Sequence, residues 1–193
     1  MSAVLAEAAS RRAAPGLALA DDAERIARAC HDMAVRFHRG GRLITFGNGG
    51  GAADAGHLAV EFTHPVIVGK RALPAFSLAN DASTLTAVAR ADGYGAAFAA
   101  QVQLLGREDD IAVGILDGHC ANVSLALGTA RDLGMLTIAL CADNSIGAHA
   151  DHVLSAHTGD PLVAAEVRVT TYHILWELVH VFFEHPALLE ATA

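Results

Sequence analysis

The sequence predicts an α/β protein of three layers, in which a parallel β-sheet is covered by helices on both faces. Short apolar runs of strand length alternate with segments whose apolar residues recur at helical spacing, and this alternation is typical of parallel sheets. The chain of 193 residues is long enough for one domain with a sizeable core, and no repeat, low-complexity tract or composition boundary divides it. We therefore expect a single domain over residues 1–193.

The N-terminal part predicts two helices before the first strand. Residues 1–14 are rich in alanine and predict a short helix, which Pro15 and Gly16 should end. Residues 21–38 predict a longer amphipathic helix. The chain is 53% hydrophobic with a mean hydropathy of +0.36, which is apolar for a soluble monomer. We therefore expect these N-terminal helices, about residues 1–40, to pack against sister subunits in a homo-oligomer.

The central stretch, residues 42–61, has the pattern of a strand, a glycine-rich turn and a helix. Residues 43–46 form an apolar run, and residues 47–51 contain four glycines that let the backbone turn sharply. The free N–H groups at the start of the following helix favour an anion. His57 and Glu61 are four residues apart, so they share a face of that helix. The pattern predicts either an anion site beside an imidazole and a carboxylate, or a structural turn with a surface His–Glu pair.

The remaining elements continue the alternation. Strands are predicted at residues 74–78, 111–116, 136–141 and 152–157. Helices are predicted at residues 84–89, 96–105, 121–133 and 161–183, with a short turn or helix at 145–149. Asp160-Pro161 is a favourable start for the last helix. Ligands of parallel sheets bind beyond the carboxyl ends of the strands, where residues 47–51 and 117–119 should lie together.

Composition excludes several classes of function. A net charge of −8 without a basic stripe argues against nucleic-acid binding. No apolar run reaches the roughly 18 residues that span a bilayer, and the N-terminus lacks the pattern of a secretory signal. Cys30, Cys120 and Cys141 are widely spaced and form no C-x-x-C pair. We expect a cytoplasmic protein whose cysteines serve packing.

Two kinds of glycine-rich turn compete for the central stretch. Residues 47–52 fit a dinucleotide-binding G-x-G-x-x-G/A turn loosely, but residues 62–80 lack the acidic residue that would bind the ribose. The run Gly47-Asn48-Gly49-Gly50, followed by Ala52-Ala53-Asp54-Ala55-x-His57 and then Glu61, resembles the sugar isomerase (SIS) domain. Within that family it is similar to the phosphoheptose isomerases, and the similarity extends to Gln101-Val102-Gln103 and to His173-Ile174-Leu175.

The resemblance implies a SIS-type three-layer sandwich, a homotetramer, a phosphorylated sugar as substrate and a site where zinc can bind. It assigns Glu61 as the base and His173 as the partner acid in ketose–aldose isomerisation, a reaction that moves a proton between adjacent carbons. It assigns His57, Glu61 and His173 as the metal ligands. The substrate-binding residues of the first turn would be Asn48, Gly49, Gly50 and Gly51.

The sequence departs from the family at the loop after the third strand. The family grips the sugar phosphate there with Ser and Thr hydroxyls, whereas this chain has Asp117-Gly118-His119, which we expect to line the substrate site instead. A free Asp117 carboxylate would repel a phosphate. Ala165 stands where the family has a metal-binding Gln. Three functions therefore stay open: a sugar-phosphate isomerase, a re-purposed SIS protein for ligand binding or assembly, and a dinucleotide-binding enzyme.

The last helix carries a polar stripe, because Glu166, His173 and His180 follow one another at seven-residue spacing. Such a stripe can face a cleft, or it can belong to a helix that packs against another subunit. We expect packing for His180 and Trp176, whereas the resemblance places His173 in the site.

Overall fold

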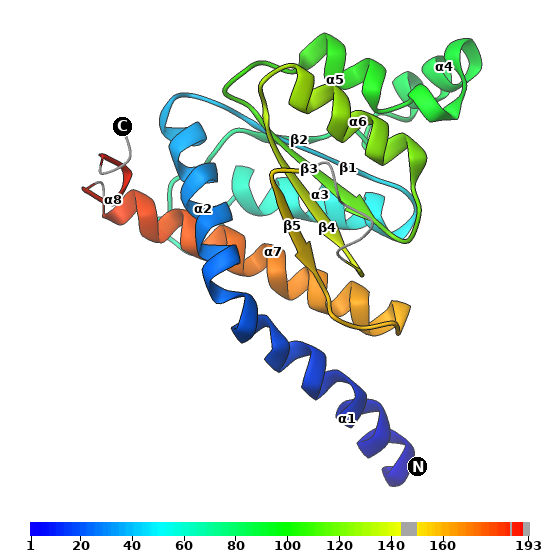
Figure 1. Ribbon diagram of the computed structural model, residues 1–193, viewed down its shortest axis with the longest axis vertical. Coiled ribbons are helices and arrows are strands. Elements are labelled where there is room, and N and C mark those ends of the chain that lie inside the picture. Colours follow the sequence, from blue (N-terminus) through cyan, green and yellow to red (C-terminus); the bar gives the residue numbers. More distant parts are fainter. Residues whose placement is uncertain (144–149, 186, 191–193) are drawn as a thin grey trace.

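The computed structural model describes residues 1–143, 150–185 and 187–190, so the turn or helix expected at 145–149 lies outside the described residues (Figure 1). Within those ranges, five parallel strands form one sheet in the order β2-β1-β3-β4-β5. The strands are β1 (Leu43–Gly47), β2 (Ala75–Ser77), β3 (Ile111–Leu116), β4 (Leu136–Cys141) and β5 (His152–Ser155). The predicted strands and their parallel arrangement are thus confirmed.

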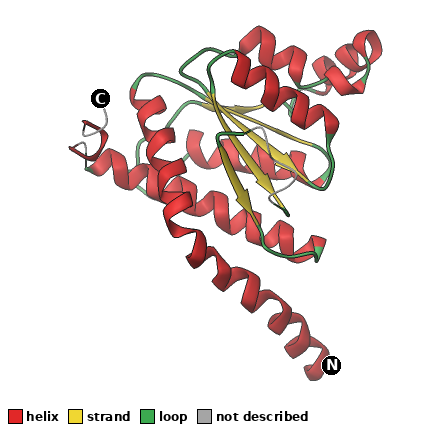
Figure 2. Ribbon diagram, viewed as in Figure 1, coloured by secondary structure: helices red, strands yellow, loops and turns green. Residues whose placement is uncertain are grey.

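Helices cover both faces of the sheet and make the three predicted layers (Figure 2). One face carries α2 (Ala23–His38), α3 (Gly50–Thr63) and α7 (Pro161–Glu184), and the other carries α5 (Ala99–Leu105) and α6 (Ala121–Asp132). The remaining helices are α1 (Ser2–Ala18), α4 (Ala82–Asp92), α8 (Ala187–Glu190) and the 3-10 turns η1 (Leu19–Asp22) and η2 (Tyr94–Ala96). Side chains of β3 alternate between the two faces, and both sets are buried, which explains why the strand is a continuous apolar run.

The expected end of the first helix at Pro15 is wrong. Helix α1 continues through Pro15 to Ala18, and η1 then leads into α2. Helix α1 buries none of its residues, so the carbonyl that Pro15 leaves without an N–H donor faces solvent, and the proline is tolerated. The helix projects away from the body of the chain (Figure 1). Its packing against another subunit stays a prediction, whereas α2 packs on α7 of its own chain.

Three further boundaries differ from the sequence expectation. Strand β5 ends at Ser155 rather than at residue 157, because His157 adopts a positive φ of 51° that no strand accommodates. Helix α4 begins at Ala82, since the Asp81 side chain caps it by accepting bonds from Ser83 and Thr84 N–H. The expected helix 96–105 is split into η2 and α5. None of the helices in the described ranges is both long and apolar enough to cross a membrane.

A buried ion pair joins the starting ends of β1 and β3, the two strands that lead to the glycine turn and to the Asp117 loop. Asp110 is 1% exposed. It accepts hydrogen bonds from the Arg42 backbone N–H at 2.8 Å, from Arg42 Nη2 at 2.6 Å and from the Arg107 N–H at 3.1 Å. These bonds hold the strands in the register that aligns their carboxyl ends.

We expect Asp110→Ala to lower the free energy of unfolding by about 3 kcal/mol, because it leaves the Arg42 guanidinium and two backbone N–H groups without their acceptor. Urea unfolding measures the change. Asp109→Ala is the matched control. The Asp109 carboxylate is half-exposed and lies as far as 4.0 Å from the Arg39 guanidinium, so removing it should lower the free energy of unfolding by less than about 0.5 kcal/mol. Equal effects of the two variants would contradict this role of Asp110.

Candidate active site

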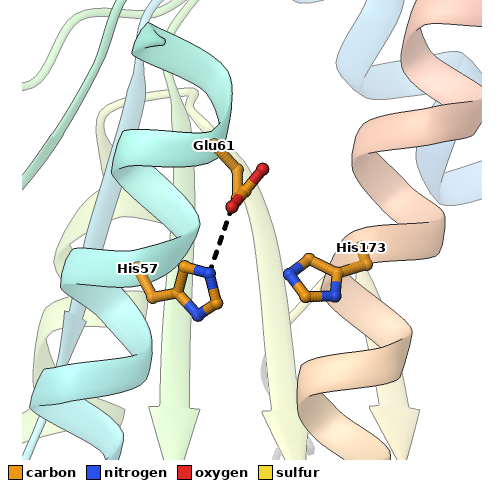
Figure 3. Close-up of side chains that lie close together, drawn as sticks. All are labelled: His57, Glu61 and His173. Atoms are coloured by element: carbon orange, nitrogen blue, oxygen red, sulfur yellow. Dashed lines mark hydrogen bonds and ion pairs between the residues drawn. The ribbon is translucent and has the colours of Figure 1, made fainter. Parts of the chain in front are cut away.

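Helices α3 and α7 lie side by side and run in the same direction, so each turn of one helix meets the corresponding turn of the other (Figure 3). Arg168 lies beside Asp54, Tyr172 beside His57, and His180 beside Phe62. Helix α3 begins directly after the glycine turn, and α7 begins where Asp160 caps its first turn. The chain thus builds its polar cluster from two segments more than 100 residues apart.

Three side chains that the sequence singled out come together between these helices. His57, Glu61 and His173 each offer one ligand atom, and these atoms all lie within 4.8 Å of one another. His57 Nε2 is 3.1 Å from Glu61 Oε1, and the His57 and His173 rings meet edge to face with centroids 5.2 Å apart (Figure 3). The sequence left open that His57 and Glu61 form an isolated surface pair, whereas in the structure His173 joins them. Two imidazoles and a carboxylate that converge in this way can hold a metal ion or transfer protons.

Tyr172 is a member of the cluster that sequence reasoning missed. Its Oη lies 2.7 Å from His57 Nδ1, on the ring nitrogen opposite Glu61. Burial, together with the nearby Asp54 and Glu61 carboxylates, raises the pKa of Tyr172 above its ordinary value, so the phenol keeps its proton. The contact fixes the orientation of the imidazole, as outer hydrogen bonds do for metal-binding histidines. An apolar helix commonly carries a tyrosine for packing, so the sequence alone gave no sign of this role.

The glycine turn has the geometry that a helix-start anion site needs. Gly49 has φ 54° and precedes the first residue of α3. Gly47 must stay a glycine, because an added Cβ would lie 2.6 Å from the Gly51 carbonyl oxygen. Asn48 holds the turn in place: its Nδ2 donates to Asn122 Oδ1 at 2.8 Å, and its Oδ1 accepts from Tyr94 Oη at 2.7 Å. The Asn48 side chain thus fixes the turn, and the substrate contact that the resemblance implies for Asn48 stays a prediction.

A cavity of about 450 Å³ lies next to the cluster, at the carboxyl ends of the strands. It is lined by Gly50 and Asp54 of α3, by Asp117 and Gly118 after β3, and by Ala165 and Arg168 of α7, among others. None of His57, Glu61 and His173 is among the described residues that line the cavity. The cavity approaches their cluster through Asp54, which lies one turn of α3 before His57.

Arg168 is the second residue that sequence reasoning missed. It is 3% exposed and forms an ion pair through Nη2 with Asp117 Oδ1, while Asp54 Oδ2 is 3.9 Å away. The Asp117 carboxylate, which was expected to repel a phosphate, is therefore paired with a buried cation. Burial raises the pKa of Asp54, and the Arg168 charge opposes that rise. An arginine inside the apolar segment Val167–Val169 was the sequence feature that could have revealed the site.

The other candidate residues fall outside the cavity. His119 is exposed and is not among the described residues that line it. Cys120 contacts the Asp117 carbonyl oxygen through Sγ at 3.5 Å. Glu166 turns outward and pairs with Arg12 of α1. His180 is buried between the carbonyl oxygens of Trp176 and Arg71 of its own chain, and the subunit packing expected for this part of the helix stays a prediction.

Comparison with known proteins gives one consistent set of relatives. Residues 12–142 match the SIS domain family. The phosphoheptose isomerase of Solidesulfovibrio magneticus is 41% identical over 167 residues, which cover 85% of this chain and 82% of that protein. The phosphoheptose isomerase of Desulfovibrio desulfuricans is 41% identical over 81% of this chain and 77% of its own length.

Solved structures give the same result. A structure of the phosphoheptose isomerase from Neisseria gonorrhoeae superposes with a TM-score of 0.82 at 31% identity, covering 92% of this chain and 97% of that one. The phosphoheptose isomerase from Francisella tularensis superposes with a TM-score of 0.82 at 26% identity, covering 94% of this chain and 99% of that one. The likeness therefore extends over nearly the whole of both chains.

Proposed function

The chain belongs to the SIS domain family, and we propose that it is a phosphoheptose isomerase-like enzyme that interconverts the ketose and aldose forms of a phosphorylated sugar. The observation that carries the proposal is the convergence of His57, Glu61 and His173 on α3 and α7, the two helices that also contribute Asp54 and Arg168 to the cavity at the carboxyl ends of the strands. The curated relatives supply the reaction class, and the cluster supplies groups that suit it.

The donor set fits a zinc ion. Zinc binds imidazole nitrogen and carboxylate oxygen at about 2.0–2.2 Å, so tetrahedral ligand atoms lie about 3.4 Å apart. Small side-chain rotations would bring His57, Glu61 and His173, now within 4.8 Å of one another, to that spacing. Three protein ligands leave one position open, as in catalytic rather than structural zinc sites. A bound zinc would act as a Lewis acid that polarises the sugar carbonyl.

The residues of the chain supply the proton transfers. Glu61 is 12% exposed in its side chain, and its carboxylate can take the proton from the carbon next to the carbonyl and return it to the former carbonyl carbon. His173 faces the same space and can move the proton between the two oxygens of the enediol formed on the way. Tyr172 holds the His57 ring in place from the opposite side. The reacting carbons would thus lie between α3 and α7.

A re-purposed binding protein is the alternative. The observation that favours it is Ala165, which lines the cavity at a position where the resemblance implies a metal-binding Gln. Such a protein would keep the scaffold for ligand binding or assembly and would not turn over a sugar phosphate. The dinucleotide-binding alternative has no support from the relatives, which are phosphoheptose isomerases.

Two further properties belong to the proposal. The apolar composition and the exposed helix α1, with Val4, Leu5 and Leu17 on its surface, favour assembly into a homotetramer. The widely spaced free cysteines favour the reducing cytoplasm.

We expect Glu61→Gln to lower kcat by roughly 10³-fold, because the amide keeps the shape of the side chain but cannot accept the proton. Conversion of sedoheptulose 7-phosphate to the aldose, followed by NMR, measures it. Glu166→Gln is the control, since that carboxylate on α7 faces Arg12 and should leave the rate unchanged. Full activity of Glu61→Gln would remove Glu61 from the mechanism.

Zinc affinity provides a separate test of the cluster. We expect His57→Ala to abolish tight binding, and Tyr172→Phe to weaken it roughly 10–100-fold, because the phenol orients the imidazole. Competition with a chromophoric chelator measures both affinities. Tyr94→Phe removes a phenol that contacts Asn48 instead, and it should bind zinc as the parent does. Unchanged metal content in His57→Ala would reject the ligand assignment.

A further inference from the structure

A buried positive charge lines the cavity, and its hydrogen-bonding capacity is only partly used within the fold. Arg168 is 3% exposed, and it is the one cation among the described residues that line the cavity. Its Nε–H is fully buried and finds no partner among the described residues. Buried donors are nearly always paired, and an unpaired one costs free energy. Arg168 lines the cavity with a planar fork of donors that the fold leaves incompletely paired, so it suits a ligand that accepts hydrogen bonds.

The present partner of Arg168 stands where an anion would bind. Asp117 Oδ2 lies 3.8 Å from the position that a Cβ on Gly50 would take and 3.5 Å from that of a Cβ on Gly51. Its carboxylate therefore lies beside the first turn of α3, whose dipole favours negative charge. The chain supplies its own anion to this position.

The two members of the ion pair differ in their freedom to leave. Asp117 is 43% exposed in its side chain and belongs to a loop, next to Gly118 with φ 73°. It can turn into solvent, where a carboxylate is well hydrated. Arg168 is held inside the long helix α7, and Asp54 stays beside it. Asp117 is thus the removable partner, and Arg168 is the fixed one.

We propose that Arg168 binds the phosphate group of the substrate, and that Asp117 is a stand-in anion that this phosphate displaces. The inference rests on the proposed function and names the residue that replaces the missing Ser and Thr hydroxyls. A guanidinium presents a planar fork of donors that matches two phosphate oxygens, and the phosphate would also reach the first turn of α3. The sugar would then extend along α3 toward Glu61, seven residues or roughly 10 Å from Asp54.

Titration calorimetry of the full chain with inorganic phosphate and with sedoheptulose 7-phosphate, at constant pH and ionic strength, tests the proposal. We expect Asp117→Asn to tighten the binding of both roughly tenfold, because the competing charge is gone while the side chain keeps its size. We expect Arg168→Gln to weaken binding of both by more than about tenfold. The unphosphorylated sugar should bind equally to the parent and to both variants.

Matched controls separate this effect from general changes. Glu166→Gln breaks a guanidinium–carboxylate pair on the same helix outside the cavity and should leave phosphate affinity unchanged. Arg168→Lys keeps the charge but not the fork, and it should bind phosphate less tightly than the parent. If Arg168→Gln does not fold, as judged by circular dichroism, the Asp117→Asn result still decides.

Two results would overturn the inference. Weaker phosphate binding by Asp117→Asn would mean that this carboxylate itself recognises the ligand, and unchanged binding would mean that the ion pair is structural. Failure of the proposed function looks different: Asp117→Asn would bind phosphate more tightly, yet neither it nor the parent would turn over a sugar phosphate. If the parent turns over a sugar phosphate while Asp117→Asn and Arg168→Gln bind phosphate as tightly as the parent does, the role of Arg168 is wrong but the proposed function stands.

Discussion

The parallel packing of α7 along α3 is the constraint on which the site depends. Because the two helices advance together, three successive levels of contact follow from one register: Asp54 with Arg168, His57 with Tyr172, and Phe62 with His180. His173 follows Tyr172 directly and so joins the level of His57. Helix α2 holds α7 from its other side, and this three-helix layer packs on the sheet through a continuous apolar core. A shift of α7 by one turn would separate every pair at once, so the apolar core that fixes the register also fixes the chemistry.

Much of the fold could be predicted from the sequence, because strand and helix patterns are local. The buried strands β1, β3 and β4 are predominantly apolar, and Asp160-Pro161 starts α7 as expected. The failures lie where the environment overrides a local preference. Pro15 stays inside α1 because the helix is solvent-exposed, and β5 stops early because His157 takes a left-handed conformation beside Asp22. Neither solvent exposure nor a contact across 135 residues is visible in a local pattern.

The site was predictable only in part, for the same reason. His57 and Glu61 share a helical face by spacing alone, whereas His173 could be joined to them only through family resemblance, since its position depends on how α7 packs. Tyr172 and Arg168 were missed because residue type does not reveal burial: a tyrosine in an apolar helix suggests core, and an arginine suggests solvent. Asp117 was recognised as a departure from the family, but the sequence could not show that its carboxylate pairs with Arg168.

The placement of Arg168 and His173 on one helix has a consequence for how this sequence can change. A single residue inserted or deleted between them would rotate everything beyond it by about 100° and shift it by about 1.5 Å. Natural variation and engineering should therefore tolerate length changes before Pro161, in the turn that precedes the helix, and exclude them between positions 168 and 173. Residues 168–173 can therefore vary by substitution but not in number.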